Sequence, residues 1–367
     1  MPKLSTGRVR RSAAAGVIVH AGRTGNRKVP VVFVAAAVLA ALAAGCGSSS
    51  PGGSSGGDIS GPTLSLKLSE LQNVNTPTTE SADKFASLVK QYTGGKITVT
   101  VYPNSELGTD SAQLAGAEAG TIAFYATPDL SAAVAQSNVL EMPYLFPSAE
   151  VASKVINSAA IRKSLWSLFP AHGLTFVGSW VIGFTSTLTK STPVTAPTNM
   201  KGLKIRVFAP TVGDKMFAAL GADAVTVDST EVPTALSTGV VTGADDPAST
   251  MVGANWYSGM CCIAETDDVF VASPMMASTK VWNTMSAAEK AAVQRAFNAT
   301  ISSNLQEAAT FNSAAIATMQ KAGLKVTKPE ISAFKSATAS VYPAIEQLYP
   351  GQVQALQAEI KSVAGSN

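Results

Sequence analysis

The spacing of apolar residues along the first half of the chain alternates between the strand period and the helix period. Alternating or β-branched segments predict strands at 64–68, 96–102, 122–125 and 175–184. Apolar residues recurring every three or four positions predict helices at 82–92, 111–119 and 151–169, the first of them ended by Gly94 and Gly95. Strands that alternate with helices in this way indicate an α/β fold.

The stretch 200–250 shows the same alternation in its most regular form. It predicts a strand at 204–208, a helix at 212–220 ended by Gly221, and a second strand at 224–227. A second helix, capped by Ser229 or Thr230, runs to 236 and ends at Gly239. This β-α-β-α-β order predicts parallel pairing, with ligand-binding groups at the carboxyl ends of the strands. Arg206 and the pair Asp245 and Asp246 lie near such ends.

The last third of the chain predicts a returning strand at 269–277 and a long helical region at 286–321. Ser286 with Glu289 fits a capping box. A helical pattern of more than 25 residues without an internal cap suggests one helix that spans two lobes. A strand at 324–326 and helices at 331–348 and 351–363 follow. We therefore expect a two-lobe α/β protein with a ligand cleft between the lobes, a hinge near 183–186 and closure by hinge motion.

Charge is distributed unevenly, and this changes how the composition is interpreted. Seven of the 27 basic residues precede Cys46, whereas none of the 24 acidic residues does. Without this leader, 20 basic residues face 24 acidic ones, so the net charge of +3 gives no support for nucleic-acid binding. A content of 46% hydrophobic and 14% charged residues is typical of a globular protein with a sizeable core.

The leader has the pattern of an export signal. A basic segment ends at Lys28, an Ala-rich apolar run of about 16 residues follows, and Gly45 precedes Cys46. The apolar run is short for a membrane span, which needs roughly 20 residues. We interpret 1–45 as a lipoprotein signal peptide with Cys46 as the lipidated residue. The alternatives are an ordinary cleaved signal and, less well supported, a twin-arginine signal at Arg10 and Arg11. Residues 46–61 read as a flexible tether that holds a soluble domain at a membrane surface.

Several motifs together resemble one family of binding proteins. They are TGGKITV (93–99), PNSELG (103–108), MPYLF (142–146), KGLKIR (201–206), LGA (220–222) and EVPTALSTGVVTG (231–243). In order and spacing these resemble the solute-binding proteins of TRAP (tripartite ATP-independent periplasmic) transporters, of the dicarboxylate-binding type, over about residues 62–345.

The resemblance implies a two-lobe periplasmic-binding-protein-like fold of type II, with a long helix shared by both lobes. We place lobe I at 62–183 plus 272–310 and lobe II at 184–271 plus 311–365. It also implies a protein that delivers an organic acid to a TRAP-type membrane permease driven by an ion gradient. With the leader pattern, we expect this protein to be extracytoplasmic, lipid-anchored and monomeric. A sensory or adaptor binding protein, or an exported enzyme on the same fold, are the alternatives.

Arg206 is the main candidate for ligand binding, because a guanidinium matches a carboxylate with two parallel hydrogen bonds. The resemblance implies the same role. Asp246 stands where the family usually has a substrate-binding asparagine, and Thr185 where many relatives have an arginine. A carboxylate at Asp246 would repel a plain dicarboxylate, which favours an acid with amine or hydroxyl donors. The alternative role for Asp246 is to cap the next helix.

The other candidate site residues rest on position alone. Aromatic residues can form the wall of the cleft or belong to the core, and polar loop residues can donate to a ligand; these candidates are Trp180, Phe184, Phe208, Trp256, Gln72, Asn73, Thr127 and Asp245. Cys261 and Cys262 are adjacent and can form a disulfide, remain as thiols or pair with another chain. With one histidine after the leader, no phosphate-binding loop and no metal-ligand spacing, we expect no catalytic residues, cofactor or metal.

Overall fold

A computed structural model describes residue 59 and residues 61–365. These residues belong to one unit of the chain, 55–367, by their internal contacts. The predicted signal peptide at 1–45, Cys46 and almost all of the tether at 46–61 lie outside the described residues. None of the helices at 61–365 is long and apolar enough to cross a membrane.

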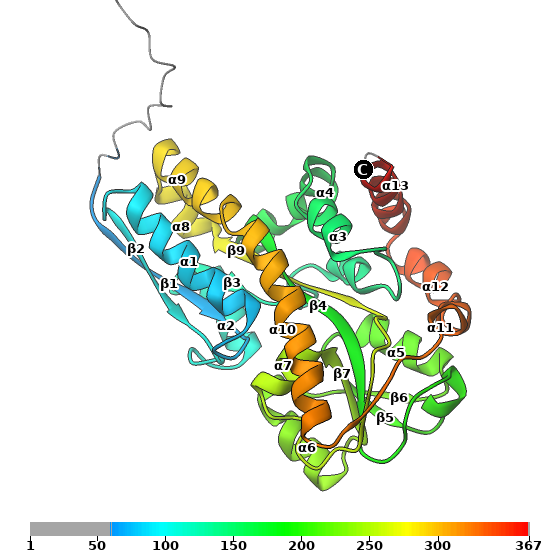
Figure 1. The fold of residues 1–367 in the computed structure, drawn as a ribbon. Helices are drawn as coiled ribbons and strands as arrows, with labels where there is room; N and C mark the ends of the chain where they lie inside the picture. Colours follow the sequence, from blue (N-terminus) through cyan, green and yellow to red (C-terminus); the bar gives the residue numbers. More distant parts are fainter. Residues whose placement is uncertain (1–58, 60, 366–367) are drawn as a thin grey trace, which may run out of the picture. The chain divides into compact units, whose positions relative to one another are not determined.

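The strands form a single mixed sheet of ten strands (Figure 1). Eight of them follow the order β2-β1-β3-β9-β4-β7-β5-β6, while β8 pairs with β4 and β10 pairs with β8. Their bounds are β1 Leu64–Glu70, β2 Ile97–Tyr102, β3 Phe124–Ala126, β4 Leu174–Thr189, β5 Lys204–Val207, β6 Asp223–Thr226, β7 Gly243–Pro247, β8 Cys262–Ala264, β9 Phe270–Ser278 and β10 Lys325–Thr327.

Strand β4 connects the two halves of this sheet. It is 16 residues long and would extend about 50 Å. Up to Phe184 it pairs antiparallel with β9, and from Thr185 to Thr189 it pairs antiparallel with β7, with β8 alongside its end. The change of partner between Phe184 and Thr185 falls inside the segment 183–186 that the sequence predicts as a hinge. The lobe boundaries themselves stay a prediction.

The first half of the sheet is built around parallel β1, β2 and β3. Its helices are α1 Pro77–Tyr92, α2 Asp110–Ala119, α8 Thr279–Thr284 and α9 Ala287–Asn298. Aromatic rings fill the core beneath α1, where Phe85 lies edge-on to Phe124 and to Trp180, and Trp180 stacks on Phe297 at 5.0 Å between centroids. Such pairs add directional contacts to the burial of apolar area.

The second half of the sheet contains the predicted β-α-β-α-β run. Strands β5, β6 and β7 are parallel, as expected, and the helices are α5 Pro210–Ala219, α6 Val232–Thr238 and α7 Ala248–Gly253. Gly239 takes the left-handed conformation that ends α6. The expected cap at Ser229 or Thr230 is wrong: those residues lie in a short 3₁₀ turn, and α6 begins after Glu231 without a side-chain cap.

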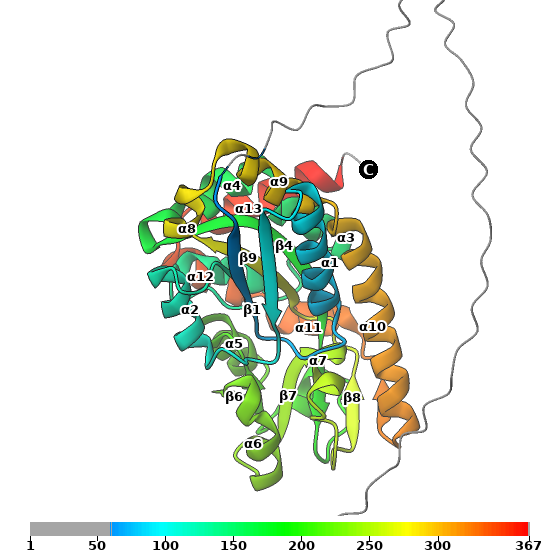
Figure 2. The same ribbon diagram turned by 90° about the vertical axis from the view of Figure 1, so that its left-hand side faces the viewer.

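The long helical region at 286–321 is present as two consecutive helices, α9 and α10 (Ile301–Lys321), with Ala299 and Thr300 between them. The Ser286–Glu289 capping box at the start of α9 is confirmed. Thr300 Oγ1 donates to the Phe297 carbonyl and accepts from Trp180 Nε1 at 2.8 Å, so the junction is fixed to β4. Helix α10 then packs against β4, α1 and α7, and thus contacts both halves of the sheet (Figure 2).

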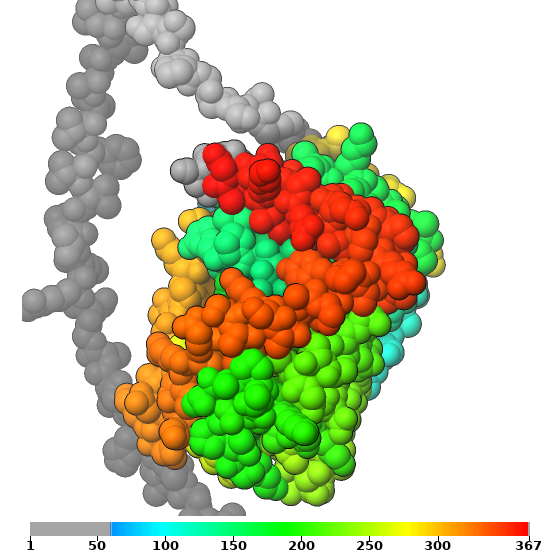
Figure 3. All heavy atoms as spheres, turned by 90° about the vertical axis from the view of Figure 1, so that its right-hand side faces the viewer, coloured from blue at the N-terminus to red at the C-terminus, as the bar shows by residue number. Residues whose placement is uncertain are grey.

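The remaining helices are α3 Ala149–Ile156, α4 Ala159–Ser164, α11 Ile331–Ala337, α12 Val341–Leu348 and α13 Gln352–Ala364. The single helices expected at 151–169 and 331–348 are each divided. Ser158 caps a new helix by accepting from the Ile161 amide, which ends the first at Ile156. Helix α12 packs on α5, whereas α13 packs on α3 and α4, so the C-terminal helices lie across the surface drawn in Figure 3.

Gly178 in β4 offers a test of this packing. A Cβ at Gly178 would lie 2.0 Å from the ring of Phe297, whereas one at Gly253 in α7 would have its nearest neighbour at 3.5 Å. We expect Gly178→Ala to lower the free energy of unfolding by about 1–3 kcal/mol through overpacking. Gly253→Ala should leave it unchanged or raise it by up to about 1 kcal/mol. Urea denaturation of both variants measures the free energy of unfolding. Equal changes in the two variants would contradict the packing of Gly178 against Phe297.

Candidate functional site

A cavity of about 80 Å³ lies at the carboxyl ends of strands from both halves of the sheet. Its walls come from the segments that follow β1, β3 and β6, from the ends of β5 and β7, and from α2, α7 and β9. This is where the predicted parallel strands should place ligand-binding groups. Its polar side chains are those of Gln72, Asp110, Thr127, Asp129, Arg206, Thr226, Asp228, Ser229, Asp246 and Thr250.

Arg206 is held in this wall by three contacts. Its Nε donates to the Val227 carbonyl at 3.0 Å, and its Nη1 lies 2.5 Å from Asp246 Oδ2 in an ion pair. The guanidinium carbon lies 5.0 Å from the centre of the Trp256 ring. Only 3% of Arg206 is exposed to solvent. The ion pair therefore satisfies a buried charge, and Asp246 does not cap α7, which has no side-chain cap.

Burial dominates the electrostatics of this pair. It lowers the pKa of Arg206, and attraction to Asp246 opposes that shift. It likewise raises the pKa of Asp246, and the charge and hydrogen bond of Arg206 oppose that shift. Breaking one side of such a pair leaves an uncompensated buried charge, which typically costs about 3–5 kcal/mol.

Two of the predicted polar loop residues lie in the same cavity. Gln72, after β1, accepts a 3.0 Å hydrogen bond from the Thr250 hydroxyl of α7, so it ties the two halves of the site together. Thr127, after β3, donates to Asp110 Oδ1 at 3.3 Å and to the Asp129 carbonyl at 3.2 Å. Asn73 does not line this cavity; its carbonyl accepts from the hydroxyls of Thr76 and Thr79 instead.

Three acidic residues in the cavity wall were missed by the sequence analysis. They are Asp110, Asp129 and Asp228. Burial, reinforced by the charge of Asp129, raises the pKa of Asp110 to about 6, although a hydrogen bond from the Tyr125 hydroxyl opposes this. Burial also raises the pKa of Asp129. Asp129 and Asp228 lie in the loops that follow β3 and β6, so the rule that ligand groups follow parallel strands could have identified these positions.

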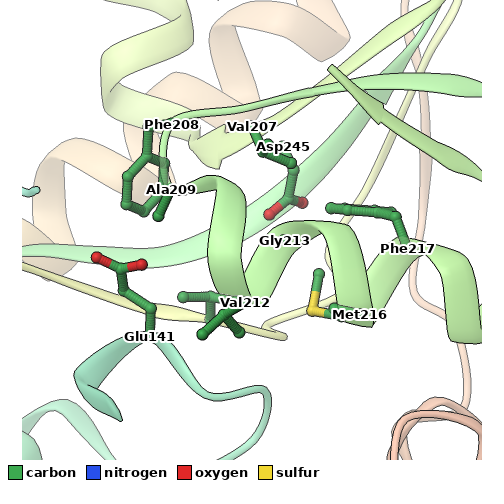
Figure 4. A pocket seen from close by; sticks show the side chains of 10 residues that line it. Glu141, Val207, Phe208, Ala209, Val212, Gly213, Met216, Phe217 and Asp245 are labelled. Carbon is green, nitrogen blue, oxygen red and sulfur yellow. The ribbon is translucent and has the colours of Figure 1, made fainter. Parts of the chain in front are cut away.

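Asp245 and Phe208 lie at a second, smaller cavity of about 20 Å³ beside α5 (Figure 4). Asp245 accepts from the Thr187 hydroxyl at 3.3 Å. Burial, together with the charge of Asp268, raises its pKa well above the usual range. Phe208 also lines the Arg206 cavity, so it separates the two spaces.

The structure does not bring the other candidates to Arg206. Trp180 is fully buried in the core of the first half. Phe184 lines a separate cavity of about 450 Å³ beside α10. The Thr185 hydroxyl donates to Asp268 and accepts from the Val269 amide. The hydroxyl at this position, where the resemblance implies an arginine in many relatives, is therefore already hydrogen-bonded within the protein.

The cysteines do not line the Arg206 cavity. Cys261 and Cys262 form a disulfide with each other at the start of β8, which decides among the alternatives left open by the sequence. Within residues 61–365 there is no group of three or more His, Cys, Asp or Glu side chains that could hold a metal ion.

A family profile described as bacterial extracellular solute-binding protein, family 7, matches residues 68–348, which is most of the chain. The chain belongs to this family. The resemblance stated from the motifs is therefore confirmed, and the family is one of binding proteins rather than enzymes.

Individual relatives agree with this assignment. The C4-dicarboxylate-binding periplasmic protein DctP of Rhodobacter capsulatus is 35% identical over 190 residues, which are 51% of this chain and 56% of that protein. The chain thus matches little more than half the length of this curated relative. A TRAP periplasmic solute-binding protein from Ochrobactrum anthropi is 28% identical, with a TM-score of 0.74 over 83% of this chain and 97% of that one. The sugar acid binding protein of Advenella mimigardefordensis, solved with galactonate, is 22% identical, with a TM-score of 0.77 over 82% of this chain and 99% of that one. These structures confirm the predicted fold class.

Glu70 ends β1 next to the cavity and is fully buried. Its Oε1 accepts from the backbone N–H of Gln72 at 3.1 Å and so orients the loop that carries Gln72. Burial raises the pKa of Glu70 from 4.5 to about 8. The folded protein therefore binds this proton over a pH range in which the unfolded chain has released it.

We expect this protonation to make stability depend on pH. Because the folded pKa is the higher one, the free energy of unfolding should fall as pH rises from about 4.5 to 8, by up to about 1.4 kcal/mol per pH unit. Glu70→Gln should remove that contribution. The stability of this variant relative to wild type should therefore be higher at pH 8 than at pH 5. Denaturant titrations at both pH values test this, with the exposed Glu80→Gln as the control. A difference from wild type that is the same at both pH values would contradict it.

Proposed function

We propose that this protein is the solute-binding component of a TRAP-type transporter and that it captures an organic acid through Arg206. The observation that carries the proposal is a buried guanidinium in a cavity at the carboxyl ends of the strands. The family assignment supports it, as do relatives whose names state binding of C4-dicarboxylates or of galactonate, both of which carry carboxylate groups.

Arg206 keeps donors for a ligand despite its ion pair. A guanidinium has five N–H groups, and the hydrogen bonds of Arg206 within the described residues come from Nε and Nη1. Nη2 is thus left to donate to a carboxylate. The neighbouring Trp256 ring and the Val227 carbonyl hold the guanidinium plane in place, so little side-chain entropy is lost when a ligand binds.

The charges around Arg206 restrict which acids fit. Asp246 already offsets the positive charge of Arg206, and Asp110, Asp129 and Asp228 add negative groups to the same wall. With Thr185 in place of a second arginine, a dicarboxylate would bring two negative charges into an acidic cavity. We therefore propose an acid with one carboxylate and with hydroxyl or amine donors for the acidic wall.

Transport follows from the two-part architecture. We propose that residues 62–183 with 272–310 and residues 184–271 with 311–365 move as lobes about the segment 183–186, where β4 changes partners. Closure would bring Gln72 and Thr250 together over the ligand, and a membrane permease would receive it from the closed form. The lipidated Cys46 and the tether 46–61 would keep this monomeric protein at the outer face of the cytoplasmic membrane.

Binding of acids can be tested by thermal denaturation with a panel of carboxylates. At about 100 times its dissociation constant a ligand should add about 2.7 kcal/mol to the free energy of unfolding, which raises the melting temperature by several degrees. Arg206→Gln should remove this increase for every acid, since it deletes the charged donor. If sugars or amines without a carboxylate stabilise both forms equally, the proposed role of Arg206 is wrong.

Asp246→Asn tests the charge balance separately. Because it removes a carboxylate from the site, we expect about tenfold tighter binding of unsubstituted monocarboxylates, measured by calorimetry. The ligand-free variant should be less stable than wild type, because Arg206 loses its partner. Asp214→Asn, on α5 outside the cavity walls described above, is the control. Unchanged or weaker affinity of Asp246→Asn would contradict repulsion by Asp246.

A further inference from the structure

Behind Phe208, two small cavities share a buried carboxylate. The first, of about 20 Å³, is lined by Glu141, Asp245 and apolar residues of α5; the second, of about 10 Å³, is lined by Glu141, Ser137 and apolar residues. Phe208 lines both and also the Arg206 cavity. The three spaces therefore adjoin one side chain. We call the two smaller ones the inner compartment.

Polar atoms in the inner compartment lack partners. Glu141 is only 6% exposed, and its Oε2 has no hydrogen-bond partner within the described residues. The Ser137 hydroxyl, 5% exposed, also has none. Buried polar groups are nearly always satisfied, and an unpaired buried carboxylate is far more costly than a hydroxyl. Figure 4 shows Glu141 and Asp245 coming from two different elements, with the first turn of α5 between their carboxylates.

Arg206 attracts Asp245, but it lines the neighbouring cavity and not the inner compartment. No lysine, arginine or histidine lines either part of the inner compartment. The first turn of α5 contributes its partial positive charge, but no hydrogen bond from that turn to either carboxylate is found in the described part of the chain. Burial raises the pKa values of Glu141 and Asp245, and the negative charges of Asp129 and Asp268, respectively, raise them further.

The geometry matches an ammonium group better than other cations. An ammonium is about the size of a water molecule, and the larger cavity can hold one such group. Its N–H donors can serve the carboxyl groups of Glu141 and Asp245, both of which line this cavity. Val212, Met216 and Phe217 provide an apolar wall for methylene groups. A metal ion is less suitable, since residues 61–365 contain no cluster of three or more metal-binding side chains.

We propose that the solute is a zwitterion whose ammonium group binds Glu141 and Asp245 in the inner compartment while its carboxylate binds Arg206. This inference rests on the proposed function and names the ligand class of the same site. The ligand's alkyl chain passes Phe208, whose ring turns to admit it. The ammonium supplies the hydrogen-bond donor that Glu141 Oε2 lacks, and the acidic wall of Asp110 and Asp129 favours its entry.

The test compares matched acids that differ only in their terminal group. The full-length protein is titrated by calorimetry at about pH 7.5 with β-alanine, γ-aminobutyrate, δ-aminovalerate and ε-aminocaproate. Each is compared with the unsubstituted acid and the terminal hydroxy acid of the same length. We expect at least one amino acid of this series to bind ten or more times tighter than both of its matched acids.

Glu141→Gln and Asp245→Asn should each remove this preference while binding of the unsubstituted acids stays measurable. Glu346→Gln is the matched control, because Glu346 also has an unpartnered Oε2 but lines none of the cavities described above. Thermal denaturation of the ligand-free variants shows whether they are folded. If Glu141→Gln does not fold, Asp245→Asn carries the test.

Two outcomes overturn the inference and separate it from the proposed function. If unsubstituted or hydroxy acids bind as tightly as the amino acids, or if Glu141→Gln and Asp245→Asn keep the preference, the ammonium site is wrong and carboxylate capture by Arg206 stands. If no acid of any series binds, carboxylate capture by Arg206 fails as well.

Discussion

A guanidinium that is almost completely buried at the end of β5 constrains everything built around it. Arg206 cannot lose its proton at physiological pH, so the fold must supply negative charge close by. Asp246 does this at 2.5 Å from the neighbouring strand β7, and the Val227 carbonyl satisfies Nε. Strands β5, β6 and β7 must therefore keep their parallel register, because a shift of one residue would turn Arg206 or Asp246 to the opposite face of the sheet.

This ion pair also sets the electrostatics that a ligand meets. In a site where Arg206 stands unpaired, a carboxylate would supply the missing charge. Here Asp246 supplies it first, and Asp110, Asp129 and Asp228 make the surrounding wall acidic. A ligand carboxylate must then gain its affinity from the remaining N–H groups of Arg206, and the rest of the ligand must offer hydrogen-bond donors or positive charge.

Motion in this protein is constrained by β4, which belongs to both halves of the sheet. The strand is continuous, so the halves can move relative to each other only by bending it where its partners change, between Phe184 and Thr185. Helix α10 contacts both halves as well, and Asn312 on α10 bonds the Ile182 carbonyl at 2.7 Å and the Ser249 amide at 3.1 Å.

The sequence by itself determined most of the strands and helices, the parallel β5-β6-β7 unit and the family, because periodicity, glycines at helix ends and short motifs are local properties. It also identified Arg206, Asp246, Gln72, Thr127 and Phe208, which lie at or near the ends of predicted strands and line the cavity. Only the tertiary structure decided which residues contact one another. It placed Trp180 in the core, because that face of β4 packs against Phe85 and Phe297. It divided the long helix at Thr300, whose hydroxyl bonds Trp180. It also brought Asp110 and Asp129 to the Arg206 cavity and Glu141 to the inner compartment, since their positions depend on contacts between residues far apart in the chain.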